Sequence, residues 1–136
     1  LYSMIGRFDE AEKNYIQALT LYKNTVGESH PLYGSTVNNL GSLYYMQEKY
    51  DQAEAMFIEA LNICENIYGR HQLEFASTAD NLRLLYTKVN RLDEAMKYMN
   101  LVVDAYQKIY GEEDEIYKES LNVKKDLEAM MEKKQA

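Results

Sequence analysis

The sequence predicts an all-α fold in which helix pairs stack into a solenoid that ends in a C-terminal capping helix. Three observations predict it: a repeat with a constant period, apolar residues at spacings of three and four, and glycines and acidic residues where helices should end and begin. The 136 residues, 46% of them hydrophobic, suffice for one compact core or one stack.

The period is 42 residues. The segments that begin at Gly6, Glu48 and Asn90 share one pattern, and aligning them brings identical residues into register. The aligned sets are Tyr2, Tyr44 and Tyr86; Asp9, Asp51 and Asp93; Ala11, Ala53 and Ala95; and Gly27, Gly69 and Gly111. A fixed period of this size is typical of stacked repeats, because each unit is too small to bury its own apolar face.

Each period contains two helices. In the middle repeat we expect a first helix that buries Leu40, Leu43 and Tyr44 on one face. The buried face of the second helix should contain Ala53, Phe57, Ala60, Leu61 and Cys64. Cys64 is the single cysteine, and its apolar neighbours indicate a small core residue rather than a reactive thiol.

Helix ends are marked in each period. Asp9, Asp51 and Asp93 lie where a carboxylate could accept backbone N–H bonds at the start of the second helix, with Glu12 and Glu54 at the third position of a capping box. The glycines at 27, 69 and 111 follow that helix, where a left-handed C-terminal cap needs no side chain.

These residues resemble the tetratricopeptide repeat (TPR). The middle repeat carries its pattern on Leu40, Gly41, Tyr44, Ala53, Phe57 and Ala60; the first supplies Tyr2, Ala11, Tyr15 and Ala18, and the third Leu82, Tyr86 and Ala95. The 42-residue step, with "GESHP" between units, is similar to the long TPR form of kinesin light chains and nephrocystin-like proteins. The resemblance implies a right-handed α-solenoid of TPR helix-turn-helix pairs.

The domain organisation follows from the repeat. Residues 1–113 form a TPR array of about two and a half repeats whose first repeat is truncated, and residues 114–136 form the capping helix. The chain begins partway through a repeat, so we expect a neighbouring repeat or subunit at its N-terminal face. The final "EKKQA" is typical of a natural C-terminus.

The last repeat departs from the pattern. Arg83 replaces the small residue, Met99 the aromatic residue and Val102 the second alanine, which predicts looser packing of this helix pair. The cap should form a helix from about Ile116 to Lys133. Its inner face should carry Ile116, Val123, Leu127 and Met130, and Lys124 stands in the slot of Leu40 and Leu82.

Composition and charge exclude several classes of function. A net charge of −7 repels phosphate backbones, so we expect no nucleic acid partner. No apolar run reaches the length of a membrane span and no signal peptide is recognisable, which favours a cytoplasmic protein, with cytoskeletal or ciliary association open.

An enzymatic reading has little support. His30 precedes Pro31 in a loop similar to the family's structural "HP" turn, and His71 lies one residue from the equivalent slot. Cysteine and histidine do not have metal-ligand spacing, and Cys64 has no evident base nearby. We therefore expect no catalytic residue, no metal and no cofactor.

The TPR resemblance implies a concave groove lined by the first helix of each pair. The residues that should point into it are Ser35, Asn38, Asn39, Ser42, Tyr45, Met46, Ser77, Asp80, Asn81, Leu84, Thr87 and Lys88, with Asn122 and Asp126 from the cap. Asn38, Asp80 and Asn122 recur at the period and could form a ladder that hydrogen-bonds the main chain of an extended peptide. Alternatively, these groups bond to neighbouring helices or to water.

The expected partner is a protein or peptide that is neutral or basic rather than acidic. A carboxylate clamp of the TPR chaperone type would need lysine or arginine where Asn38 and Asp80 stand, and only Lys88 is basic on the inferred face. The competing interpretation is structural: the array stacks end to end or docks permanently in a larger assembly, for example a cytoskeletal or ciliary one.

Overall fold

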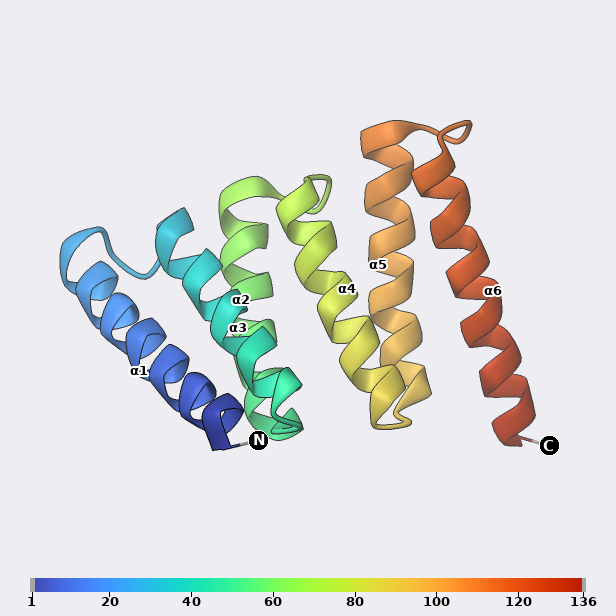
Figure 1. Cartoon of the computed structure of the whole chain (residues 1–136). Helices are drawn as coiled ribbons and strands as arrows, with labels where there is room; N and C mark the ends of the chain where they lie inside the picture. The colour runs from blue at the N-terminus through green and yellow to red at the C-terminus, as the bar shows by residue number, and fades with distance from the viewer. Residues whose placement is uncertain (1, 136) are drawn as a thin grey trace. The chain divides into compact units, whose positions relative to one another are not determined.

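The structure, a computed structural model, describes residues 2–135 and is all-α over that range (Figure 1). The helices are α1 (Tyr2–Thr25), α2 (Pro31–Met46), α3 (Tyr50–Tyr68), α4 (Leu73–Lys88), α5 (Leu92–Tyr110) and α6 (Glu115–Gln135). The chain forms two compact units that divide between Ile67 and Tyr68; unit 1 contains α1 to α3, and unit 2 contains α4 to α6. The predicted all-α class is confirmed.

The 42-residue period of the sequence is also the period of the helices. The first helices of the two pairs, α2 and α4, both have 16 residues, and the second helices, α3 and α5, both have 19. The starts of α2, α4 and α6, at Pro31, Leu73 and Glu115, are separated by one period each. Each complete repeat therefore contains two helices, as predicted.

The core of unit 1 joins its three helices. Tyr33 and Val37 of α2 pack with Ala60 of α3, and Leu19 and Tyr22 of α1 close the cluster from the other side. The predicted buried faces are confirmed in full: the buried residues of α3 are Ala53, Phe57, Ala60, Leu61 and Cys64, and those of α2 include Leu40, Leu43 and Tyr44. Burial of these apolar side chains is the main stabilising contribution to the unit.

A small residue on α2 lets α3 approach closely. A Cβ atom at Gly41 would lie 2.8 Å from ring carbons of Phe57, closer than real Cβ contacts come. Phe57 is itself only 2% exposed, so its ring cannot move into solvent. About two helical turns before Gly41 on α2, a Cβ at Gly34 would lie 2.9 Å from Cγ2 of Ile63. The two glycines therefore set the distance between α2 and α3.

In unit 2, α4 packs on α5, and α5 packs on α6 (Figure 1). Met99 and Val102, which stand in the slots of Phe57 and Ala60, are each only 1% exposed. These slots are thus filled as completely as those of unit 1, so the looser packing predicted from them is not observed at these positions. Tyr86 of α4 also stacks on Tyr98 of α5, with 5.6 Å between ring centroids.

The turns inside the helix pairs share one conformation. Glu48 and Asn90, one period apart, both have a left-handed backbone, with φ of 61° and 64°. The amide that follows each of them returns to the end of the preceding helix: Lys49 N donates to Tyr44 O at 2.9 Å, and Arg91 N donates to Tyr86 O at 2.8 Å. These bonds satisfy carbonyls that the helix end would otherwise leave unpaired.

The equivalent turn is missing in the first repeat, which corrects the prediction that a helix begins at Asp9. Gly6 occupies the slot of Glu48, yet α1 continues through it from Tyr2 to Thr25, and Asp9 lies inside the helix. The shared slot therefore does not by itself fix a turn, and here the local preference for continued helix prevails. The side chains of residues 2–5, including the framework position Tyr2, lie outside the described side chains, and Leu1 lies outside the described residues.

The predicted capping aspartates are also displaced. The N-cap of α5 is Arg91, so Asp93 lies inside the first turn, and Asp51 lies in the first turn of α3. Their carboxylates still interact favourably with the positive end of the helix dipole, although neither residue is the N-cap. At the other ends the prediction holds, because Gly27, Gly69 and Gly111 have φ of 92°, 78° and 91° within two residues of the ends of their helices.

The loop before α2 is structural, as predicted. His30 is the N-cap residue, and its Nδ1 accepts a hydrogen bond from Leu32 N at 3.1 Å, with Pro31 at the first helical position. His30 thus accepts from one of the backbone N–H groups that a helix start leaves without a partner, and Pro31 has no backbone N–H that would need one.

The capping helix α6 confirms part of the predicted inner face, because Leu127 is buried and Val123 is half-buried, but Ile116 and Met130 are exposed. Ser120 and Leu127, two turns apart, are its buried residues, at 5% and 3% exposure, whereas Ile116 and Met130 are 46% and 43% exposed. Met130 is three residues from Leu127 and so points about 60° away from it around the helix. Ile116 lies in the first turn and lines the groove described below.

Replacing Gly111 by alanine should lower the free energy of unfolding by about 1–2 kcal/mol, because alanine at φ 91° is strained whatever its surroundings. The matched control is Gly6→Ala. Neither position has an atom within 4 Å of an added Cβ, but Gly6 lies in a helix. The control should therefore be neutral or stabilising by up to about 1 kcal/mol in urea unfolding. Equal effects of the two changes would contradict the left-handed cap.

Candidate functional site

Six of the predicted site residues form the unburied face of α2. The core uses Tyr33, Gly34, Thr36, Val37, Leu40, Gly41, Leu43 and Tyr44. The predicted set is Ser35, Asn38, Asn39, Ser42, Tyr45 and Met46, all of them half-buried or exposed. We call these six residues the α2 stripe.

The members of the α2 stripe differ in how accessible they are. Met46 is 60% exposed and Asn39 is exposed. The Tyr45 ring contacts the Tyr50 ring edge-on, with 5.6 Å between centroids, and the Ser35 hydroxyl donates to Leu32 O at 3.2 Å within the helix. Asn39 and Met46 are therefore the members best placed to contact a partner.

The corresponding face of α4 carries the second predicted set. Ser77, Asp80, Asn81, Leu84, Thr87 and Lys88 are half-buried or exposed, and we call them the α4 stripe. Leu84 is 42% exposed, and the Thr87 hydroxyl donates to Arg83 O at 2.8 Å. The α2 and α4 stripes belong to different units, and the ladder of Asn38, Asp80 and Asn122 across them stays a prediction.

Asp80 is paired within its own helix. Arg83 donates to Asp80 Oδ1 from Nε at 3.0 Å and approaches it with Nη2 at 2.9 Å. The Arg83 side chain is only 16% exposed and that of Asp80 is 32% exposed, so the pair is partly shielded from water. The sequence analysis treated Arg83 only as a misfit in a small slot; its spacing of three from Asp80 was the signal that could have predicted the pair.

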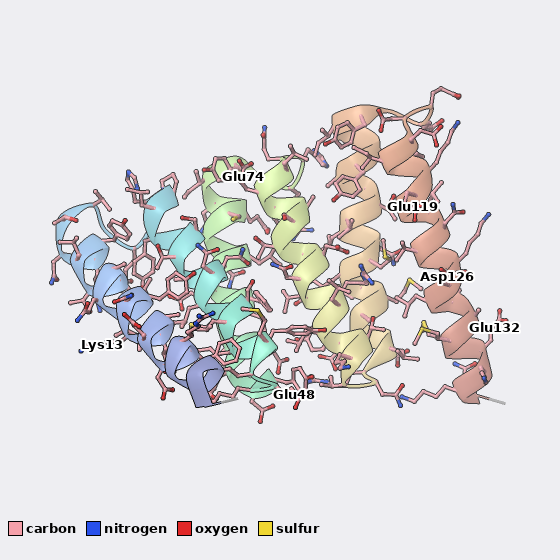
Figure 2. The ribbon with its side chains drawn as sticks, in the orientation of Figure 1. Lys13, Glu48, Glu74, Glu119, Asp126 and Glu132 are labelled. Atoms are coloured by element: carbon pink, nitrogen blue, oxygen red, sulfur yellow. The ribbon has the colours of Figure 1, made fainter. Side chains whose placement is uncertain are left out.

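The Asp80–Arg83 pair lies on an open groove of about 430 Å³ between the three helices of unit 2, which we call the α4–α6 groove. Its lining comprises Asp80, Arg83, Met99, Val102, Tyr106, Glu115, Ile116, Glu119, Ser120 and Val123. The apolar members come mainly from α5 and α6, and two exposed carboxylates stand on α6. Figure 2 shows Glu119 on this helix, with Asp126 and Glu132 further along it. The groove thus combines an apolar floor with an acidic edge.

Tyr106 reports the electrostatics of the groove. Burial raises the pKa of its hydroxyl above the usual 10.0, and the negative charge of Asp80 raises it further, while the charge of Arg83 opposes the increase. In unit 1, burial likewise raises the pKa of Tyr44, whose hydroxyl donates to Glu12 Oε1 at 3.0 Å and so links α2 to α1. Both phenols therefore stay neutral to a higher pH than a free tyrosine does.

The described residues offer little for catalysis or for a membrane. Across residues 2–135, no group of three or more His, Cys, Asp and Glu side chains is arranged to hold a metal ion. His71 Nε2 contacts Asp104 Oδ2 at 3.0 Å in an exposed pair, and Cys64 is buried. Within the same range, each helix is too short or too polar to cross a bilayer.

Comparison with protein families gives one clear match. The model of the family described as tetratricopeptide repeat matches residues 1–66 and 35–108, and the two matches together cover residues 1–108 of the 136. The chain has no significant match among curated protein sequences.

Two solved structures have a similar fold. BtubC (BKLC) from P. vanneervenii is 20% identical, with a TM-score of 0.65 over 96% of this chain and 60% of that one. A Podosopora anserina protein, described as a kinesin light chain with nearly identical TPR-like repeats, is 17% identical, with a TM-score of 0.77 over 93% of this chain and 60% of that one. The chain therefore spans 60% of the length of each. The predicted all-α fold of TPR repeats is confirmed, and the fold is similar to that of these two structures.

The titration of Tyr106 should change in opposite directions when its two charged neighbours are neutralised. Asp80→Asn should lower the pKa of Tyr106 towards 10.0, and Arg83→Gln should raise it, as measured by NMR on ¹³C-labelled tyrosine. The neutral phenol contributes stability that is present below pH 10.0 and is lost as pH rises through the higher folded-state pKa. Shifts of the same sign in both variants would contradict this placement of the charges.

Proposed function

This chain belongs to the tetratricopeptide repeat family, and we propose that it binds another protein through the α2 and α4 stripes. TPR repeats are, in general, scaffolds for protein–protein interaction. The finer proposal is that a peptide segment of the partner lies along the unburied faces of the first helices. TPR proteins and their kinesin light chain relatives are typically not enzymes, and we propose the same for this chain.

One observation carries the proposal: the helix faces that the core leaves unused bear polar groups, most of them uncharged. On α2 the buried positions hold the core together, while Asn39 and Met46 are exposed on the opposite side. An asparagine amide both donates and accepts, so it can bond to the main chain of a peptide with little demand on its sequence. These groups can meet a partner without any loss of core contacts.

We further propose that the partner is neutral or basic and that the complex forms in the cytoplasm, including on cytoskeletal or ciliary structures. A net charge of −7 favours partners of positive charge and disfavours nucleic acid. The two relatives of similar fold are compatible with a cytoskeletal setting. No cofactor or metal enters this proposal.

Removing one amide from each stripe tests the proposal. The double variant Asn39→Ala with Asn81→Ala should reduce capture of the partner from a cell extract about tenfold, as measured by quantitative mass spectrometry. The matched control is Asn62→Ala with Asn100→Ala, which makes the same changes at exposed positions of α3 and α5. Equal capture by the two double variants, at unchanged melting temperatures, would contradict binding through the stripes.

A structural role is the second candidate, favoured by the state of α1. Its framework residues Ala11, Tyr15 and Ala18 are half-buried, whereas Ala53 and Ala60, which occupy two of the same slots in α3, are 0% exposed. A further helix docked on α1, from another part of the protein or from a neighbouring subunit, would complete this face.

Leu21→Lys tests the second candidate. Leu21 is 57% exposed on α1, so a lysine there should dissolve an assembly that uses this helix, as measured by light scattering. Met46, at 60% exposure on α2, provides the comparison: Met46→Lys should weaken partner capture and leave the assembly intact. An assembly that survives Leu21→Lys would argue against the structural role.

A further inference from the structure

We propose that the α4–α6 groove binds an apolar side chain of a partner protein that carries lysine or arginine beside it. The inference rests on the proposed function, because it names the chemistry of a partner for one part of the same array. It adds a specific place, the groove of unit 2, which shares Asp80 with the α4 stripe and otherwise uses residues outside both stripes, mainly on α5 and α6.

The size and floor of the groove suit an apolar side chain. Its volume of about 430 Å³ lies within the range of sites that enclose small groups. Met99 and Val102 are 1% exposed and form the buried floor, whereas Ile116 at its wall is 46% exposed. A ligand side chain that covers Ile116 removes this apolar surface from water, which favours binding.

The groove exists because of the residues that depart from the repeat pattern. In unit 1 the slot on the first helix is Gly41, and the Phe57 ring lies directly against it. In unit 2 the same slot holds Arg83, whose side chain pairs with Asp80 on the groove wall. A flexible Met99 replaces the ring, so the floor can adapt to the shape of the group it receives.

The charge of the groove favours a basic neighbour on the ligand. Arg83 is already paired with Asp80 at 2.9 Å, so this cation is neutralised within the chain. Glu115 and Glu119 stand exposed on the α6 edge, and the acidic segment from Glu112 to Glu115 leads into the same edge. An acidic ligand would meet two like charges here, whereas lysine or arginine would find two partners of opposite charge.

Further along α6 the same edge stays acidic. Glu119 and Asp126 are seven residues apart, which corresponds to two helical turns, so their side chains lie on one side of the helix (Figure 2). A segment that extends from the groove along α6 therefore passes a second carboxylate. The ligand is thus expected to carry more than one basic residue around its apolar anchor.

The probe is an array of short randomised peptides, tested against the whole chain. Peptides that pair leucine, isoleucine, phenylalanine or methionine with lysine or arginine should be enriched, and their binding should weaken as salt is raised. A synthetic peptide from the enriched set then serves for titration by fluorescence anisotropy. Enrichment of acidic peptides, or no enrichment of any class, would overturn the inference.

Charge variants locate the binding. Glu115→Gln with Glu119→Lys should weaken the synthetic peptide about tenfold. Glu128→Gln with Glu132→Lys makes the same changes at the same spacing on exposed positions of α6 that do not line the groove, and it should leave binding unchanged. Equal weakening by both pairs would mean a diffuse charge effect and would sink the assignment to the groove.

Apolar variants test the anchor. Ile116→Ser should weaken the peptide several-fold, and Met130→Ser should not, although both residues are similarly exposed on α6, at 46% and 43%. Since the two side chains are exposed to a similar extent, the two changes should affect the melting temperature equally.

The two proposals can fail separately. If acidic or neutral peptides bind, and the Asn39→Ala with Asn81→Ala variant weakens them, the groove inference fails and the stripes stand. If basic apolar peptides bind at the groove while that variant captures partners normally, the stripes fail and the groove stands.

Discussion

The close approach of α2 to α3 at Gly41 is the constraint on which the helix pairs of this chain depend. The ring of Phe57 lies where any side chain at position 41 would have to go, so only a residue without a Cβ permits this distance between the helices. The approach brings Val37 into contact with Ala60, and Leu19 of α1 then closes the cluster from the other side. One small residue thereby decides whether three amphipathic helices can share one interior.

Unit 2 meets the same constraint in a different way, and its candidate site follows from that difference. Arg83 is too large to lie beneath an aromatic ring, and its guanidinium reaches Asp80 on the outer wall instead. Met99 and Val102 fill the slots on α5, and both also line the α4–α6 groove, together with Asp80 and Arg83. A departure from the repeat pattern that weakens the sequence signal thus creates the feature with most functional interest, as is common where a site interrupts a regular fold.

The sequence alone predicts the elements that repeat and mispredicts those that depend on a single neighbour. Each buried residue of α3 follows from spacing and period, because every turn of that helix faces the same partners. The continuous α1 could not be foreseen, since a slot shared with Glu48 and Asn90 does not by itself fix the backbone conformation at Gly6. Ile116 and Met130 were placed on the inner face of the cap because their spacing fits a helix; which of several adjacent lines is buried depends on how α6 rotates against α5. The Asp80–Arg83 pair needed the side-chain geometry of α4, which a period does not contain. The stripes of α2 and α4 are the helix faces that do not enter the core, so the sequence pattern could predict which residues they contain. Whether a partner binds them is not a property of the fold and could not be predicted in this way.

The most direct measurement is a double-mutant cycle between Gly41 and Phe57, using free energies of unfolding in urea. Gly41→Ala should lower stability by about 1–3 kcal/mol in the wild-type background, because the added methyl group meets a ring that is 2% exposed. In the Phe57→Leu background, where the smaller side chain leaves room, the same change should cost little, which gives a coupling energy of about 1 kcal/mol or more. Additive effects of the two changes would contradict the account, because the distance between α2 and α3 would then not depend on this contact.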